Sequence, residues 1–280
     1  MARGRNLSRL DVVLVERGLV PTRARAQAAA LAGEVYVDGE PVTKVGTRVD
    51  AGAVIEIRAR RPPFVSRGGI KLDHALTAFA LDVRGLRAVD VGASTGGFTD
   101  CLLKRGAAHV YAIDVGTGQL AWELRTDPRV TVLERRDVRS VAAEELGGAV
   151  DIATADFSFI GLGKVLAALR ALVRSGGSVV ALVKPQFEAG PRAAKRGVVR
   201  EAAVHEDVLR RVIGQAEATD FHVLDATHLP IAGPDGNLEY FLRLEAGPGP
   251  SSPVDVAGAV QTAHELVPRR GVRRAAGRPR

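Results

Sequence analysis

The sequence predicts an α/β protein in which a small α+β domain precedes a larger domain with a mostly parallel, doubly wound sheet. Three observations carry this prediction. Between residues 88 and 183, apolar strand patterns alternate with helical ones, as βαβ units require. A glycine-rich run, residues 92–97, follows the first strand, where nucleotide-type folds turn into their first helix. Residues 6–57 instead run helix, helix, small sheet.

Length and composition narrow the class of protein. A chain of 280 residues with 46% hydrophobic residues is long enough for one large and one small domain. The single cysteine, Cys101, excludes an intrachain disulfide framework and is expected to be buried on the helix after the glycine run. No apolar run approaches the roughly 18 residues of a membrane span, and the N-terminus lacks the apolar core of a signal peptide. We therefore expect a cytoplasmic protein without a membrane partner.

The net charge of +7 is unevenly distributed. Residues 1–67 hold 12 Lys/Arg against 7 Asp/Glu, and residues 268–280 hold six arginines and no acid. Because a phosphate backbone attracts such patches whatever its sequence, RNA or DNA is the expected partner of the N-terminal part. The basic end is either a further nucleic-acid contact or a solubilising tail. The six histidines show no metal-ligand spacing, so no metal is expected.

The first domain is expected over residues 6–58. A helix begins near Leu10 and ends at Gly18, and Thr22 is placed to cap a second helix that reaches Leu31. Asp38-Gly39 then predicts a hairpin, with a return strand near residues 54–57. Basic side chains of this domain either meet RNA phosphates or form a solvated face. The candidates for RNA contact are Arg9, Arg23, Arg25 and Lys44.

The second domain is expected over residues 68–246, after a proline- and arginine-rich linker at residues 59–67. A helix over residues 70–80 precedes the sheet and carries Lys71, which is a surface lysine in the alternative interpretation. Five strands are expected near residues 88–91, 110–114, 130–133, 150–155 and 178–183. Two more, near residues 221–226 and 238–244, predict an antiparallel pair at the sheet edge. Residues 247–280 are expected to form a flexible basic tail.

The glycine run indicates which cofactor this sheet binds. It lacks the Gly-x-Gly-x-x-Gly form that a pyrophosphate site favours, and seven strands resemble the S-adenosylmethionine-dependent methyltransferase architecture more than the nicotinamide one. Asp114 lies 22 residues after Gly92, near the spacing of roughly 20 at which an acid meets ribose hydroxyls. Asp137 could accept from an adenine amino group, and both acids could instead be loop or capping residues. The candidate cofactor-binding residues are Asp90, Gly92, Ala93, Ser94, Gly96, Gly97, Phe98, Asp114 and Asp137.

Four charged residues form a candidate catalytic set: Lys71, Asp156, Lys184 and Glu239. Asp156 and Lys184 follow the fourth and fifth strands, and the carboxyl ends of parallel strands face the ligand crevice of an open α/β sheet. A lysine that closes an apolar run is either a functional group or a charge that reaches solvent.

These residues resemble known families. The motifs Arg9-Leu10-Asp11, Thr22-Arg23-Ala24-Arg25-Ala26 and Val35-Tyr36-Val37-Asp38-Gly39 resemble the S-four-type RNA-binding module, which is named after the fourth protein of the small ribosomal subunit. The four charged residues match the Lys-Asp-Lys-Glu tetrad of FtsJ-like ribose 2′-O-methyltransferases, and the whole chain resembles the TlyA family, also called haemolysins. This resemblance implies S-adenosylmethionine-dependent methylation of cytidine 2′-hydroxyls in small- and often large-subunit ribosomal RNA. Ribosomal RNA and ribosomal subunits are the implied partners.

The tetrad suggests a mechanism, and rival functions remain. A 2′-hydroxyl must lose a proton to attack a sulfonium methyl group, and our hypothesis is that Lys184 is the general base.

A cytosine-5 methyltransferase would need a cysteine at a strand end, where Cys101 does not lie. A membrane-lytic haemolysin would need an amphipathic or spanning segment, and a non-enzymatic ribosome-binding protein would not need the tetrad. Loop residues Arg192, Lys195 and Arg196 either grip RNA phosphates or carry incidental charge.

Overall fold

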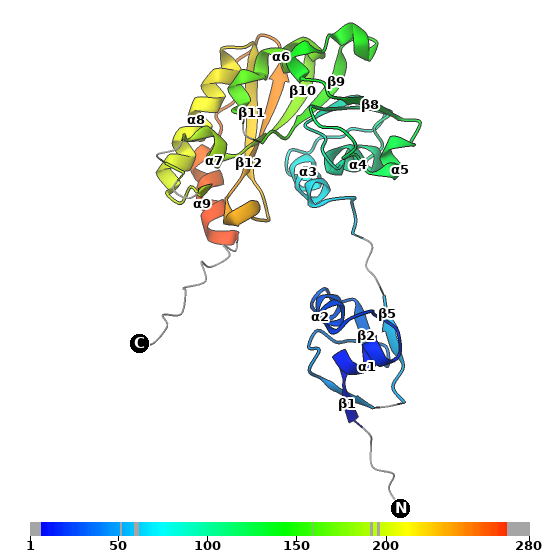
Figure 1. Cartoon of the computed structure of the whole chain (residues 1–280). Helices are drawn as coiled ribbons and strands as arrows, with labels where there is room; N and C mark the ends of the chain where they lie inside the picture. The colour runs from blue at the N-terminus through cyan, green and yellow to red at the C-terminus, as the bar shows by residue number, and fades with distance from the viewer. Residues whose placement is uncertain are drawn as a thin grey trace, which may run out of the picture. The chain divides into compact units, whose positions relative to one another are not determined.

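The structure of the chain is a computed structural model that describes residues 7–50, 52–58, 62–158, 160–190, 193–194 and 197–267. The chain divides into two compact units, Met1–Pro62 and Pro63–Arg280, and each unit has its own core (Figure 1). The two units are described separately below.

The small unit contains two helices and two small sheets. Helices α1 (Leu10–Glu16) and α2 (Arg23–Leu31) pack together over a core that includes Leu10, Leu14 and Val35. The backbone N–H of Arg25 donates to Thr22 Oγ1 at 3.2 Å, so Thr22 caps α2 as the sequence predicts. Strand β1 pairs with β4, and β2 pairs with both β3 and β5. The strands are β1 (Leu7–Arg9), β2 (Val35–Val37), β3 (Glu40–Pro41), β4 (Arg48–Asp50) and β5 (Ile55–Ile57).

The large unit is built on a seven-stranded sheet, which confirms the predicted α/β fold with seven strands. The strand order is β11-β12-β10-β9-β6-β7-β8, and every pairing is parallel except those of β12, which runs antiparallel to both of its neighbours. The strands are β6 (Arg87–Val91), β7 (His109–Asp114), β8 (Val130–Glu134), β9 (Val150–Ala155), β10 (Val173–Val183), β11 (Phe221–His228) and β12 (Tyr240–Ala246).

Helices cover both faces of this sheet (Figure 1). One face packs on α3 and α4 through residues such as Leu72, Leu102 and Phe241, and the other packs on α6, α8 and α9. The α-helices are α3 (Arg67–Ala78), α4 (Gly97–Lys104), α5 (Trp122–Arg125), α6 (Leu166–Leu172), α7 (Pro185–Glu188), α8 (Ala202–Glu217) and α9 (Val256–Leu266). The short 3₁₀ turns are η1 (Val138–Ser140), η2 (Ala143–Leu146), η3 (Leu162–Lys164) and η5 (Pro234–Gly236).

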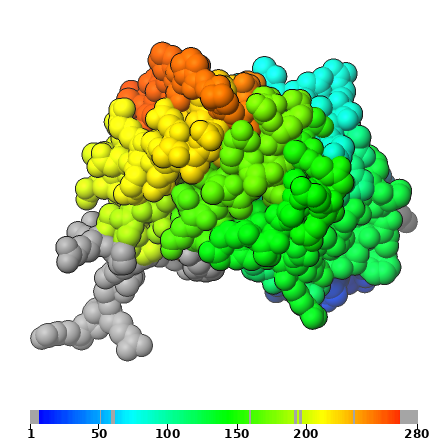
Figure 2. Space-filling view, turned by 90° about the horizontal axis from the view of Figure 1, so that it is seen from above, coloured from blue at the N-terminus to red at the C-terminus, as the bar shows by residue number. Residues whose placement is uncertain are grey.

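The segment after β12 differs from the flexible tail that we expected. Val256, Val260 and Ala263 recur at helical spacing, and α9 buries them against α8 and β11. Figure 2 shows the surfaces of α8, in yellow, and of the C-terminal segment, in orange, next to each other. The buried stripe of α9 consists of only a few small apolar residues, so its helical pattern is weak. The arginines of residues 268–280 led us to expect a flexible tail instead. Those arginines lie outside the described residues.

Two expectations about the chemistry of the chain can be compared with the structure. Cys101 is buried on α4, and burial raises the pKa of its thiol to about 12, so it offers no thiolate at neutral pH. Among the described residues, no helix combines the length and the apolar character that crossing a bilayer would require.

Candidate active site

The turn after β6 admits little but glycine at two positions. Gly92 has φ +83°, and a Cβ atom there would lie 2.3 Å from the backbone oxygen of Asp156. A Cβ atom on Gly97 would lie 2.3 Å from Ser66 Oγ. The turn is therefore held between the end of β9 and the start of α3. Without side chains at these positions, its backbone can approach a bound ligand closely.

A first cavity, of about 400 Å³, opens at the carboxyl ends of β6, β7 and β8. Asp114 closes β7, and its carboxylate accepts from the backbone N–H groups of Ser94 at 2.8 Å and Gly116 at 2.7 Å. Asp114 thus fixes the glycine turn as well as facing the cavity. The lining residues are Val91, Gly92, Ser94, Ile113, Asp114, Val115, Gln119, Arg136, Asp137, Val138, Asp156, Phe157, Ser158, Ile160 and Val165. We call this space the cofactor pocket.

Asp137 reaches the cofactor pocket from the loop after β8. Its carboxylate caps η1 by accepting from the N–H of Arg139 at 2.9 Å, and it also pairs with the guanidinium of Arg139 at 2.6 Å. These interactions lower the pKa of Asp137 to about 2. A carboxylate that is charged at all physiological pH values can accept a hydrogen bond from an amino group in the pocket.

Asp90, a predicted cofactor-binding residue, lies beneath the turn instead of on the pocket wall. It is fully buried, and its carboxylate accepts from the hydroxyls of Thr99 at 2.7 Å and Thr154 at 3.0 Å. Burial raises its pKa to about 6. Because it joins β6, β9 and α4, Asp90 supports the turn from within the core. Gly96 also lies outside the pocket lining, where it caps α4 at φ +92°.

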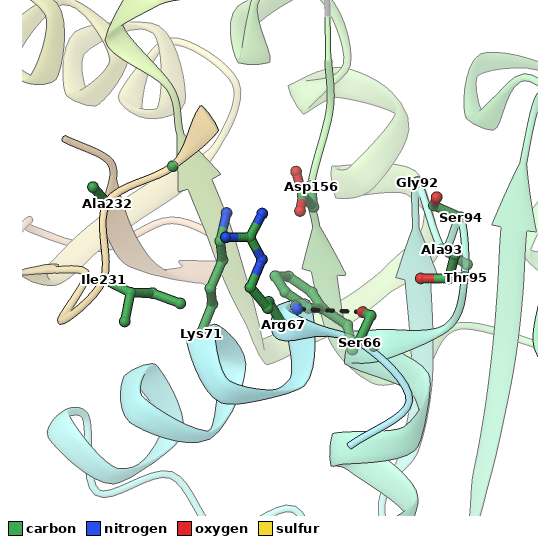
Figure 3. Close-up of a pocket in the computed structure, with 14 residues that line it drawn as sticks. Ser66, Arg67, Lys71, Gly92, Ala93, Ser94, Thr95, Asp156, Ile231 and Ala232 are labelled. Atoms are coloured by element: carbon green, nitrogen blue, oxygen red, sulfur yellow. Dashed lines mark hydrogen bonds between the residues drawn. The ribbon is translucent and has the colours of Figure 1, made fainter. Parts of the chain in front are cut away.

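A second cavity, of about 240 Å³, adjoins the first and shares Gly92, Ser94 and Asp156 with it. Figure 3 shows Arg67 and Lys71 rising from α3 into this space. The other lining residues include Ser94 and Thr95 from the glycine turn and Ile231, Ala232 and Gly233 from the loop between β11 and β12. We call this space the acceptor pocket. Its wall carries two cations and one carboxylate, and a donor in the cofactor pocket could react with an acceptor placed here.

The four tetrad residues come together as two ion pairs. Lys71 Nζ lies 2.6 Å from Glu239 Oε2, and Lys184 Nζ pairs with Asp156 Oδ1. Glu239 has no exposed side-chain surface, whereas 24% of the Asp156 side chain is exposed. Ser158 Oγ accepts a hydrogen bond from Lys184 at 3.2 Å. Lys71 and Asp156 line the acceptor pocket, while their ion-pair partners Glu239 and Lys184 line neither pocket.

The sequence did not reveal several residues of these walls. Ser66, which caps α3 by accepting from the N–H of Gly68, and Arg67 line the acceptor pocket. Phe157 and Gln119 line the cofactor pocket. An arginine in the first turn of α3 opposes the helix dipole, and this unfavourable placement was the one signal that could have identified Arg67.

In the small unit, the predicted basic residues gather around one buried acid. Asp11 accepts from Arg9 at 3.0 Å and from Arg23 at 2.7 Å, and these two hydrogen bonds hold its pKa well below its usual range. The loop that carries Lys44 lies beside Asp11, whose backbone N–H donates to Val45 O at 3.2 Å.

Of the other predicted RNA contacts, only Arg25 lies within the described residues. Arg25 lies 3.4 Å from Glu34. Arg192, Lys195 and Arg196 lie outside the described residues. Over the parts of the chain that the structure describes, no three His, Cys, Asp or Glu side chains are grouped so that they could hold a metal ion.

Comparisons with known proteins give the same division of the chain. Residues 64–246 match the family of FtsJ-like methyltransferases, and residues 8–55 match the S4 domain. The chain is 48% identical over 241 residues to the Mycobacterium tuberculosis 16S/23S rRNA (cytidine-2′-O)-methyltransferase TlyA, covering 85% of this chain and 89% of that protein. It is 36% identical over 234 residues to Hemolysin A of Brachyspira hyodysenteriae, covering 83% and 97%.

A solved structure is also similar. It is that of a Streptococcus thermophilus protein described under the name hemolysin, with a TM-score of 0.73 and 41% identity. The similarity covers 93% of this chain and 96% of that one, so both units are included.

Proposed function

This chain belongs to the family of FtsJ-like methyltransferases, and on that premise we propose that it methylates the 2′-hydroxyl of cytidine in ribosomal RNA, using S-adenosylmethionine. The observation that carries the proposal is the pair of adjoining pockets with the Lys71–Glu239 and Lys184–Asp156 ion pairs beside them. Methyl transfer needs a donor and an acceptor aligned across a short gap, and the shared wall at Gly92, Ser94 and Asp156 supports that alignment.

The cofactor pocket fits S-adenosylmethionine in size and in chemistry. Asp114 and Asp137 would accept from the ribose hydroxyls and the adenine amino group, while Ile113 and Val138 would contact the flat base. The glycine turn would hold the methionine end at the N-terminus of α4, near Gly97. When bound, this cofactor supplies a methyl group that its sulfonium centre already activates.

The acceptor pocket would hold the target ribose. Lys71, anchored by the sealed carboxylate of Glu239, is a fixed cation on the wall. Lys184 is the proposed general base, and it must be a neutral amine when it accepts the proton of the 2′-hydroxyl. Asp156, which lines both pockets, would orient Lys184 and the hydroxyl.

The small unit would supply the RNA partner. Asp11 orients the guanidinium groups of Arg9 and Arg23, and the two arginine side chains remain more than half exposed, which suits contact with phosphates. The M. tuberculosis relative is named for both 16S and 23S rRNA, and we extend that choice of substrates to this chain. Ribosomal subunits in the cytoplasm would be the target. The same assembled tetrad favours an enzyme over a membrane-lytic protein or a passive ribosome-binding protein.

The test is transfer of a tritiated methyl group to isolated small and large ribosomal subunits, followed by digestion to nucleosides. We expect the label in 2′-O-methylcytidine, and we expect Asp156→Asn to abolish it while the variant still melts like the wild type. Label on a base would refute ribose methylation. Near-normal transfer by Lys184→Ala, with its fold and RNA binding intact, would refute the assignment of Lys184 as the base.

A further inference from the structure

The one tryptophan of the chain is among its most exposed side chains. Trp122 begins α5, and 75% of its surface is exposed. Among the described residues of the large unit, the other aromatic rings are buried or half-buried. Examples are Phe98, Phe157, Tyr240 and Phe241. An indole left in water does not gain the stabilisation that burial of a large apolar side chain provides. Tryptophan is enriched at contacts with partners, which makes this ring a candidate contact.

The backbone that carries Trp122 is firmly held. Leu120 and Leu124 on either side of it are buried in the core. The backbone N–H of Ala121 donates to Thr95 O at 3.3 Å, and Gln119 Oε1 accepts from Ser94 Oγ at 3.1 Å. The indole is thus presented from a rigid base, so little conformational entropy would be lost when it is contacted.

The position of this base is next to the reaction site. Thr95, which accepts from Ala121, lines the acceptor pocket, and Gln119 lines the cofactor pocket. Trp122 follows directly and lines neither pocket. Its backbone therefore lies beside the glycine turn, outside the lining of both pockets. Arg67, from α3, lines the acceptor pocket (Figure 3) and has no ion-pair partner among the residues that the structure describes.

Resting on the proposed function, we propose that Trp122 is a stacking platform for a nucleobase of the substrate RNA next to the target nucleotide. A strand whose ribose enters the acceptor pocket must leave it over the rim, where its next bases are unstacked and need a new surface. A flat aromatic face at that point stacks on a base of any sequence. Arg135, which is exposed and whose backbone N–H donates to Gly116 O at 3.1 Å, adds a cation to the same loop region.

The experiment measures steady-state methyl transfer to ribosomal subunits by the full-length chain and its variants. Trp122→Ala should raise KM for the subunits roughly 10-fold, as expected for one lost base–aromatic stack, and leave kcat and KM for the methyl donor unchanged. Trp122→Phe and Trp122→Tyr should recover most of that loss because they restore a flat ring. Trp122→Leu should not recover it, because it restores apolar surface without a ring face. Leu266→Ala, at a 67% exposed position on α9, is the matched control and should change nothing.

A second readout uses the tryptophan itself. Under conditions where filter binding detects a complex with protein-free ribosomal RNA, the intrinsic fluorescence of Trp122 should be quenched. Unchanged fluorescence in that complex, or an unchanged KM in Trp122→Ala, would overturn the proposal. Wild-type KM in Trp122→Leu would indicate an apolar contact with a ribosomal protein and would overturn it as well. A wild-type chain that transfers no methyl group to RNA would instead refute the proposed function.

Discussion

Asp90 makes the stability of the large unit depend on pH in a way that can be calculated. Its carboxyl is fully buried between Thr99 and Thr154, and burial raises its pKa from 3.8 to about 6. Between these two values the folded protein keeps a proton that the unfolded chain releases. The free energy of unfolding therefore falls as the pH rises through this window, and it stays lower above pH 6. A shift of about two pKa units corresponds to about 3 kcal/mol.

Replacing Asp90 with Asn removes the charge and keeps the shape. The stability of Asp90→Asn relative to the wild type should then increase by about 2–3 kcal/mol between pH 4 and pH 7. Any constant cost of rearranging the hydrogen bonds to the two threonines cancels in this comparison. The assay is urea denaturation followed by circular dichroism at several pH values in that range. Asp207→Asn, at an exposed position of α8, is the control. A stability difference for Asp90→Asn that stays constant with pH would refute the reasoning.

Three further predictions concern the turn, the tetrad and the RNA-binding face. Gly92→Ala should prevent cofactor binding, measured by calorimetry, because its Cβ would lie 2.3 Å from a backbone oxygen. The control is Gly118→Ala, whose Cβ would have nothing within 4 Å. It should lower the stability in a thermal melt by only about 1 kcal/mol. Glu239→Gln should lower kcat at least ~100-fold and destabilise the large unit by about 3 kcal/mol, because Lys71 loses its buried counter-ion. A wild-type kcat in this variant would contradict the prediction. Asp11→Asn should weaken rRNA binding in filter assays without changing cofactor affinity, since it frees the two arginines that it orients.

Much of the fold could be predicted because its signals are local. Strand and helix periodicities are visible within short windows, and so are the cap at Thr22 and the hairpin at Asp38-Gly39, where φ is +51° and +87°. The insertion of β12 between β10 and β11 was not visible, because strand order depends on contacts far apart in the sequence. The early start of β10 at Val173 was also hidden, since an irregular register separates it from Ser178.

The candidate site, like the fold, could be predicted from the sequence only where its signals are local. Charged residues at strand ends could be identified from the sequence, but their pairing could not, because Lys71 and Glu239 are separated by 168 residues. Asp90 shows a different limit. A carboxylate at the end of a buried strand points either into the crevice or into the core, and only the positions of Thr99 and Thr154 settle which. A strand's alternation gives the face of a residue but not the partner that its side chain finds there.

The two ion pairs of the tetrad are unequal, and this difference bears on the direction of proton transfer. The side chain of Glu239 has no exposed surface, and Gln186 Nε2 donates to its other carboxylate oxygen at 3.3 Å, so Glu239 holds Lys71 in a fixed position. Asp156 lines both pockets with 24% of its side chain exposed, so it is the tetrad residue that can contact both the methyl donor and the acceptor.

The proposed proton acceptor belongs to the second pair, whose carboxylate lines both pockets. Asp156→Asn should therefore reduce methyl transfer more than Glu239→Gln, because Asp156 holds the proposed base and lines both pockets, whereas Glu239 acts through Lys71. Equal losses of methyl transfer in the two variants would show that the pairs play equivalent parts, and would contradict the assignment of Lys184 as the base.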